Sequence, residues 1–155
     1  MKVVINTTTL SVFGRLKRID LLRRLLGGSE ILIPEQVVQE YSLIVDDKDE
    51  IPNSFRVLEV AIEEKPNLGS GENACIEIAK KEKAVFVTDD LRARRIASSE
   101  DVKITGTLGL ILAGVELGKI TRGEEREILK EIYARKLLYI PRSLYKELLR
   151  RTSSI

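Results

Sequence analysis

The chain has 155 residues, with 26 basic and 24 acidic side chains, a net charge of +2, one cysteine and no histidine. The absence of histidine excludes a Ser-His-Asp or Cys-His catalytic unit, an imidazole zinc site and a histidine acid–base pair. The single cysteine, Cys75, excludes an internal disulfide, and its apolar neighbours predict a buried helix residue. No apolar segment is long enough for a signal peptide or a membrane span, so we expect a cytoplasmic protein. The lack of tryptophan and the abundance of charged residues favour a heat-adapted source.

Strands and helices alternate along the sequence. In the first half, β-branched and apolar runs predict strands over residues 3–5, 30–33 and 57–62, and apolar residues at helical spacing predict helices over residues 16–26 and 34–45. In the second half we expect helices over residues 71–81, 91–97, 107–118, 122–135 and 142–151, and strands over residues 84–87 and 102–104. This alternation is typical of a three-layer α/β/α fold around a parallel sheet, here of about five strands in one domain spanning residues 1–155.

Polar side chains directly follow two of the predicted strands. Asn6 comes after the first strand, and Asp89 and Asp90 come after the fourth. Ligands of open α/β sheets bind beyond the carboxyl ends of the strands, so these side chains share one edge if the two strands are neighbours. The alternative is local, because Asn6 can start a turn and an aspartate can cap the next helix. One cap accounts for one aspartate and leaves the other unexplained.

Two glutamates lie on predicted helices. On a helical wheel Glu72 falls on the buried side with Cys75, although an acid in a first helical turn is also favoured by the helix dipole. Glu40 lies at the edge of the apolar stripe that contains Val37 and Tyr41, where a solvated boundary residue is the simpler interpretation. Carboxylates packed together repel one another unless a cation neutralises them, and oxygen ligands suit Mg²⁺ or Mn²⁺.

A basic helix follows the aspartate pair. Arg92, Arg94 and Arg95 can hold phosphates beside an acidic metal site. An exposed helix whose charge is balanced by Glu100 and Asp101 explains the same pattern equally well. The small net charge of the whole chain means that any surface for nucleic acid must be local.

These motifs resemble those of the PIN-domain family, which includes the VapC-type toxin ribonucleases. The resemblance is carried by a strand ending in Asn6, a Val-x-x-Glu stretch ending at Glu40, a Gly-Glu pair at Glu72 and a Thr-x-Asp pattern ending at Asp90. It extends from about residue 3 to residue 150. The chain is most similar to an uncharacterised PIN-like subfamily through Asp-Asp-x-x-Ala-Arg over residues 89–94 and Thr-Gly-Thr-Leu-Gly over residues 105–109.

The resemblance implies a Mg²⁺- or Mn²⁺-dependent endoribonuclease of toxin type. Its substrate would be RNA, its regulator an antitoxin protein, and its assembly a homodimer. The implied metal ligands are Glu40, Glu72 and Asp90, with Asn6 and Asp89 assisting and Thr8 orienting the attacking water. The implied RNA-binding residues are Arg92, Arg94 and Thr107. Which of Asp89 and Asp90 binds the metal stays open.

Asn6 departs from the pattern of active PIN nucleases, which have aspartate at this position. An amide oxygen can bind a cation but brings no charge, so a non-catalytic PIN-like module that binds RNA or protein is the alternative function. A third hypothesis is a dinucleotide site, because residues 69–74 fit G-x-G-x-x-A. It is weakened by the loop over residues 63–68, which separates these glycines from the preceding strand. The apolar excess over residues 108–117 also favours the homodimer.

Overall fold

The centre of the molecule is a parallel sheet. The computed structural model describes residues 1–44 and 46–153, and within them five strands lie in the order β3-β2-β1-β4-β5. The strands are β1 (Lys2–Ile5), β2 (Glu30–Pro34), β3 (Arg56–Leu58), β4 (Val85–Val87) and β5 (Ile104–Thr105). Every neighbouring pair is parallel. The predicted α/β fold with about five strands is therefore confirmed.

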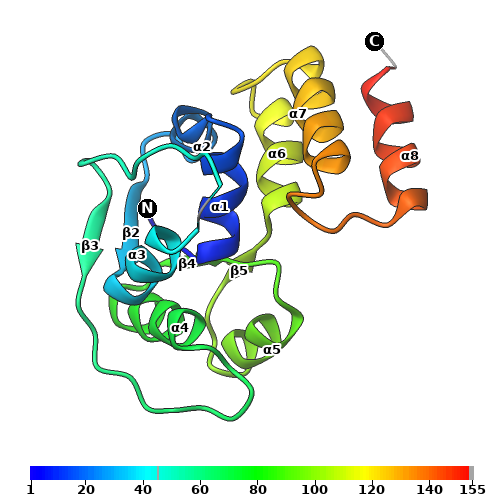
Figure 1. The fold of residues 1–155 in the computed structure, drawn as a ribbon. Coiled ribbons are helices and arrows are strands. Elements are labelled where there is room, and N and C mark those ends of the chain that lie inside the picture. Colours follow the sequence, from blue (N-terminus) through cyan, green and yellow to red (C-terminus); the bar gives the residue numbers. More distant parts are fainter. Residues whose placement is uncertain (45, 154–155) are drawn as a thin grey trace.

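Helices cover both faces of this sheet (Figure 1). The helices are α1 (Thr7–Arg15), α2 (Ile19–Leu25), α3 (Glu35–Ser42), α4 (Ser70–Glu82), α5 (Leu91–Ser99), α6 (Thr107–Glu116), α7 (Arg122–Ala134) and α8 (Arg142–Thr152). Helices α1, α2 and α6 lie on one side, and α4 and α5 on the other. Helix α3 contacts both α1 and α4, while α7 joins α6 to the outermost helix, α8. No helix in the described part of the chain is long and apolar enough to cross a membrane.

After their first residues, Lys2 and Glu30, strands β1 and β2 are apolar, as expected for strands with helices on both faces. The side chains of residues 3–5 in β1 and residues 31–33 in β2 are buried, as are Phe86 and Val87 in β4. Such continuous burial is the pattern of a parallel sheet between two helical layers. The thiol of Cys75 is fully buried on α4, as the sequence predicted.

Helix α1 is absent from the sequence prediction, which placed one helix over residues 16–26. The structure instead has α1 and α2, separated by a turn in which Lys17 has a φ of 58°. The prediction was wrong because Thr7–Thr9 are poor helix formers in the interior of a helix. Two features override this propensity: Asn6 caps the helix, and the face that contains Leu10 and Phe13 is buried.

Other differences concern the ends of elements. Strand β3 is shorter than the expected 57–62, and β5 lies at residues 104–105 rather than 102–104. Helix α3 ends at Ser42, earlier than expected, and position 45, which we included in this helix, lies outside the described residues. The remaining predicted strands and helices are present, with ends that differ by a few residues.

Candidate functional site

The site lies where the strand order reverses. Strand β1 pairs with β2 on one side and with β4 on the other, and Ile5 is in register with Val87. Asn6 and Thr88 therefore leave neighbouring strands side by side at the carboxyl edge of the sheet. Such a switch point is the usual ligand position of open α/β sheets. The sequence argument required the first and fourth strands to be neighbours, and the pairing of β1 with β4 meets this condition.

Asn6 is buried and all of its side-chain hydrogen-bonding groups are in use. It is 1% exposed, and its Oδ1 accepts from the backbone N–H of Thr9 at 2.9 Å, which caps α1. Because a backbone donor meets Oδ1, the other end of the amide must be the Nδ2 donor. Nδ2 donates to Thr88 Oγ1 at 2.9 Å and to Glu72 Oε1 at 3.1 Å. Asn6 thus presents an N–H group, not an oxygen, to the acidic cluster.

Glu72 lies in the first turn of α4 and points toward Asn6. Its two oxygens accept from Asn6 and, at 3.4 Å, from the hydroxyl of Thr88. Burial, together with the negative charges of Asp90 and Glu40, raises the pKa of this carboxyl to about 7 against the opposing hydrogen bonds from Asn6 and Thr88. At neutral pH Glu72 therefore exchanges a proton readily.

Glu40 reaches the same edge from α3. Its Oε1 accepts from Thr7 Oγ1 at 3.1 Å, and its carboxylate lies against Gly71, directly before Glu72. A Cβ atom at position 71 would overlap Glu40 Oε1. The glycine of the Gly-Glu pair is therefore needed to admit the carboxylate of Glu40 beside α4.

The two adjacent aspartates stabilise two different helices. Asp90 Oδ1 accepts from the N–H of Ala93 at 2.8 Å and caps α5. Asp89 accepts from the N–H and the hydroxyl of Thr107, at 2.9 and 2.5 Å, and so holds the first turn of α6. From the sequence, one helix cap accounted for only one of the two aspartates. The structure accounts for the other, because Asp89 binds the first residue of α6, a helix that comes later in the chain. Of the two aspartates, Asp90 is the one whose negative charge raises the pKa of Glu72. Asp90 therefore interacts electrostatically with the acidic cluster.

The predicted RNA-binding residues differ in accessibility. Arg92 is exposed on α5. A Cβ atom at Gly106 would lie 3.2 Å from Arg94 Nη2 and 2.7 Å from Asp89 Oδ1, so both groups flank this glycine. Thr107 is fully buried, with its hydroxyl between Asp89 and, at 3.2 Å, the hydroxyl of Thr9. The predicted contacts of these three residues with RNA stay predictions.

The charge of α5 is not balanced as the alternative interpretation proposed. Glu100 forms ion pairs with Lys65 at 3.5 Å and Lys80 at 3.4 Å. Within residues 1–44 and 46–153, neither Arg92 nor Arg95 forms an ion pair. The exposed guanidinium groups of α5 are therefore available to an anion.

Two threonines beside the acids were given no role from the sequence. Thr88 is fully buried, accepts from Asn6 and from the N–H of Asp90 at 3.2 Å, and links both to Glu72. Thr7, not Thr8, donates to Glu40, while Thr8 is exposed in the first turn of α1. The Thr-x-Asp pattern contained the signal for Thr88. The expected action of Thr8 on a water stays a prediction.

The edge therefore gathers Asn6, Glu40, Glu72 and Asp90 from four different elements. As they stand, no three histidine, cysteine, aspartate or glutamate side chains among the described residues are arranged to hold a metal ion. The shared cation predicted for Glu40, Glu72 and Asp90 stays a prediction. The dinucleotide hypothesis loses its support, because Gly71 faces a carboxylate where a pyrophosphate would need to bind.

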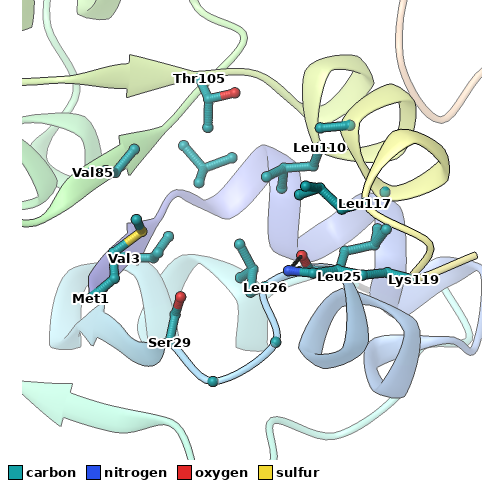
Figure 2. Close-up of a pocket in the computed structure, with 15 residues that line it drawn as sticks. Met1, Val3, Leu25, Leu26, Ser29, Val85, Thr105, Leu110, Leu117 and Lys119 are labelled. Atoms are coloured by element: carbon teal, nitrogen blue, oxygen red, sulfur yellow. Dashed lines mark hydrogen bonds between the residues drawn. The ribbon is translucent and has the colours of Figure 1, made fainter.

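A separate apolar groove lies between α2 and α6 and has a volume of about 400 Å³ (Figure 2). Side chains of β1 and β4 form its floor, and Leu25, Leu26, Leu110 and Leu117 line its sides. None of the acids of the carboxyl edge contributes to it.

Comparisons with known proteins agree with this geometry. The sequence profile of a family described as a PIN domain matches residues 2–154. Among solved structures, a PilT N-terminus domain protein from the hyperthermophilic archaeon Sulfolobus solfataricus P2 is similar in fold. Its TM-score is 0.51 at 24% identity, over 75% of this chain and 95% of that one. No curated protein matches. A profile match over nearly the whole sequence, on a sheet with polar residues at its switch point, establishes that this chain belongs to the PIN-domain family.

Proposed function

We propose that this protein is a ribonuclease of toxin type that requires Mg²⁺ or Mn²⁺. The observation that carries the proposal is the gathering of Asn6, Glu40, Glu72 and Asp90 at one edge of the sheet. PIN domains are in general nuclease-type modules that depend on divalent metals. Burial and, after it, the charges of Asp90 and Glu40 raise the pKa of Glu72, and a cation at this edge would offset the part due to these charges.

The carboxylate oxygens of the edge are the type of ligand that a hard divalent cation prefers. Glu40 and Asp90 each have one carboxylate oxygen that accepts a hydrogen bond, from Thr7 and from the backbone of Ala93. The second oxygen of each has no donor within the described part of the chain, and so is free to act as a ligand. Glu40, Glu72 and Asp90 would hold the cation. When bound, a divalent cation lowers the pKa of a water and neutralises charge on a phosphodiester.

The residues of this chain prepare the edge for that chemistry. Asn6 and Thr88 fix the orientation of Glu72 by donating to one oxygen each. Arg92, exposed on the helix that Asp90 caps, supplies a positive charge for a phosphate.

The alternative is a non-catalytic PIN-like module that binds RNA or protein. It is favoured by Asn6, whose Nδ2 already donates to Glu72 and Thr88. A ligand position that presents an N–H group repels a cation. The two functions differ in whether RNA is cut.

The test is cleavage of a mixed RNA pool in Mg²⁺, in Mn²⁺ and in a chelator. We expect slow cutting in Mg²⁺, faster cutting in Mn²⁺ because it binds nitrogen- and oxygen-bearing sites more tightly, and none in the chelator. Asn6→Asp should raise the rate about tenfold or more by adding a ligand charge, and Glu72→Gln should abolish cutting. Glu77→Gln is the matched control, because Glu77 lies on the same helix but pairs with Lys65 and Lys80 at the surface.

Cutting that persists in the chelator would refute metal dependence. If neither the parent protein nor Asn6→Asp cuts RNA, the non-catalytic binding module is the better explanation of its function.

The toxin role is tested by expression in cells. Growth should stop with the active form and continue with Glu72→Gln, and an antitoxin protein would be the partner that restores growth.

A homodimer is part of the same proposal, and the groove between α2 and α6 is its interface. Leu117 at the rim of the groove is 68% exposed, and Met1 is 86% exposed, so the groove is apolar and open to a second copy. Light scattering should give a dimer for the parent protein and a monomer for Leu117→Glu. Leu43→Glu is the control, because Leu43 is 79% exposed at the end of α3 and does not line the groove. A monomeric parent at high concentration would refute the dimer.

A further inference from the structure

The connection between α7 and α8 is a short and well-fixed segment. Helix α7 ends in a turn where Lys136 adopts the left-handed conformation, with a φ of 53°, and the N–H of Leu137 bonds to the carbonyl of Ile132 at 3.0 Å. This bond closes the helix end in the manner of a Schellman motif. The backbone is therefore defined at the point where the connection leaves α7.

This connection carries an exposed aromatic ring beside a hollow. Tyr139 is 86% exposed, and it forms, with Tyr133, Lys136, Leu138 and Ile140, a hollow of about 450 Å³. The ring of Tyr133 stacks on that of Tyr145 in α8, with centroids 3.7 Å apart and planes within 3°. One wall of the hollow is Tyr133, whose ring is packed against that of Tyr145, and the other is the exposed ring of Tyr139. No acidic side chain lines it.

The net positive charge of the chain comes from its C-terminal part. Residues 117–155 contain ten basic and five acidic side chains, whereas residues 1–116 contain 16 basic and 19 acidic ones. At the connection, Arg135 is paired with Glu131 at 3.4 Å. Lys136 and Arg142 are exposed and form no ion pair with any described residue. Two unneutralised cations therefore flank the hollow in sequence.

The hollow also lies toward the acidic edge of the molecule. Helix α6 begins at Thr107, which Asp89 holds, and α7 returns along α6 after a five-residue turn over 117–121. The end of α7 is consequently beside the start of α6, and Figure 1 shows the orange connection passing there. A chain bound at the connection can continue toward Arg92 and the carboxylates.

We propose that this hollow binds an unpaired base of single-stranded RNA, stacked on Tyr139, while Lys136 and Arg142 hold the phosphates on either side. The inference rests on the proposed function, to which it adds a binding site for the RNA strand away from the carboxylates. A flat aromatic platform accepts any base by stacking, and adjacent cations attract the backbone. A base in a duplex is already stacked and paired, so it cannot enter the hollow without being flipped out.

The test is a binding measurement that does not depend on cutting. Fluorescence anisotropy is recorded with a labelled 12-nucleotide single strand, and with the corresponding duplex, in the presence of chelator. Tyr139→Ala should weaken binding of the single strand by about 5- to 100-fold, the range for loss of one stacked base. Tyr139→Phe should bind like the parent protein. Lys136→Ala should lower the slope of log affinity against log salt by about 0.7.

Arg23→Ala is the matched control, because Arg23 is an exposed arginine on α2, near the opposite ends of the strands. Irradiation of RNA that contains 5-bromouridine should cross-link Tyr139 in the parent protein, as read by mass spectrometry. The proposal is overturned if Tyr139→Ala binds the strand within twofold of the parent, if the duplex binds as well as the strand, or if the parent binds no RNA. It is also overturned if Tyr139→Ala only converts a dimer to a monomer, because the hollow then holds a second copy.

The two proposals fail in different ways. A parent protein that binds RNA through Tyr139 but never cuts it refutes the ribonuclease and leaves the binding hollow intact. A parent that cuts RNA with binding indifferent to Tyr139 refutes the hollow and leaves the ribonuclease intact.

Discussion

Replacing Asn6 by aspartate tests the electrostatics of the acidic edge directly. Aspartate caps a helix as well as asparagine does, so the hydrogen bond to Thr9 is retained. The change acts on the other half of the side chain, where a carboxylate oxygen replaces Nδ2 at 3.1 Å from Glu72 Oε1. Two donated hydrogen bonds, to Glu72 and Thr88, are lost.

The magnitude follows from these contacts. Two unit charges about 4 Å apart repel by roughly 4 kcal/mol at an effective dielectric constant of 20, and each lost hydrogen bond contributes about 1 kcal/mol. Two responses reduce this loss of about 6 kcal/mol: the Thr88 hydroxyl can turn to donate to the new carboxylate, and Glu72 can take up a proton, which removes most of the repulsion. We expect Asn6→Asp to lower the free energy of unfolding by about 2–4 kcal/mol at pH 8 in chelator. In a chain of this length that corresponds to a fall in Tm of roughly 5–15 °C.

The dependence on pH and metal has a definite sign. The added carboxylate raises the pKa of Glu72 further above its present value of about 7, so the native state of the variant binds more protons than the unfolded state. The stability of the variant relative to the parent then falls as pH rises above about 7, and this loss is largely recovered at pH 5.5. Saturating Mn²⁺ should recover it at pH 8, because a cation replaces the proton between the carboxylates.

Thermal unfolding in chelator and in Mn²⁺, at pH 5.5 and pH 8, measures all of these effects. An Asn6→Asp protein that is as stable as the parent at pH 8 in chelator would refute the Asn6–Glu72 contact. An equal loss at both pH values would refute its electrostatic origin.

Two further substitutions probe the same edge. Glu72→Gln should make the protein about 1–3 kcal/mol more stable than the parent at pH 8 and no different at pH 4.5, as measured by urea unfolding. The raised pKa of Glu72 means that the parent loses stability as pH rises from about 4.5 through 7, whereas glutamine does not titrate. Gly71→Ala should lower stability by about 1–2 kcal/mol and weaken Mn²⁺ binding, because the methyl group displaces the carboxylate of Glu40. Gly69→Ala, which meets no atom, should do neither; equal effects at both glycines would contradict the packing argument.

The main features of the fold could be predicted because its signals are local. The β-branched runs at residues 3–5 and 30–33 and the apolar periodicity of the later helices each describe one element. Helix α1 could not be predicted in this way. Its threonines oppose a helix locally, and the helix is stabilised by the Asn6 cap and by a buried face against distant parts of the chain.

The site shows the same division between local and long-range information. Placement after strands predicted that Asn6 and the aspartates share an edge, and the buried side of a helical wheel predicted that Glu72 points inward. The different hydrogen-bond partners of Asp89 and Asp90 could not be predicted from their adjacent positions in the sequence. Asp89 binds Thr107, which is 18 positions away, and no local pattern at Asp89 reports this partner. The amide of Asn6 was expected to offer an oxygen, and only the cap at Thr9 reveals that it offers nitrogen.

The bond between Asp89 and Thr107 has a consequence for how this protein can diverge. It ties the first turn of α6 to the end of β4, and α7 and α8 follow α6 in a chain of pairwise contacts. The C-terminal helices are therefore attached to the acidic edge through the start of α6, and to α2 through Lys119 and Glu124. Substitutions on the surfaces of α7 and α8 can change what these helices bind without altering the hydrogen bonds of the acids. A change in the tilt of α6 would move α7 and α8 together relative to the sheet. The proposed RNA-binding hollow and the acidic edge can in this way change independently of each other.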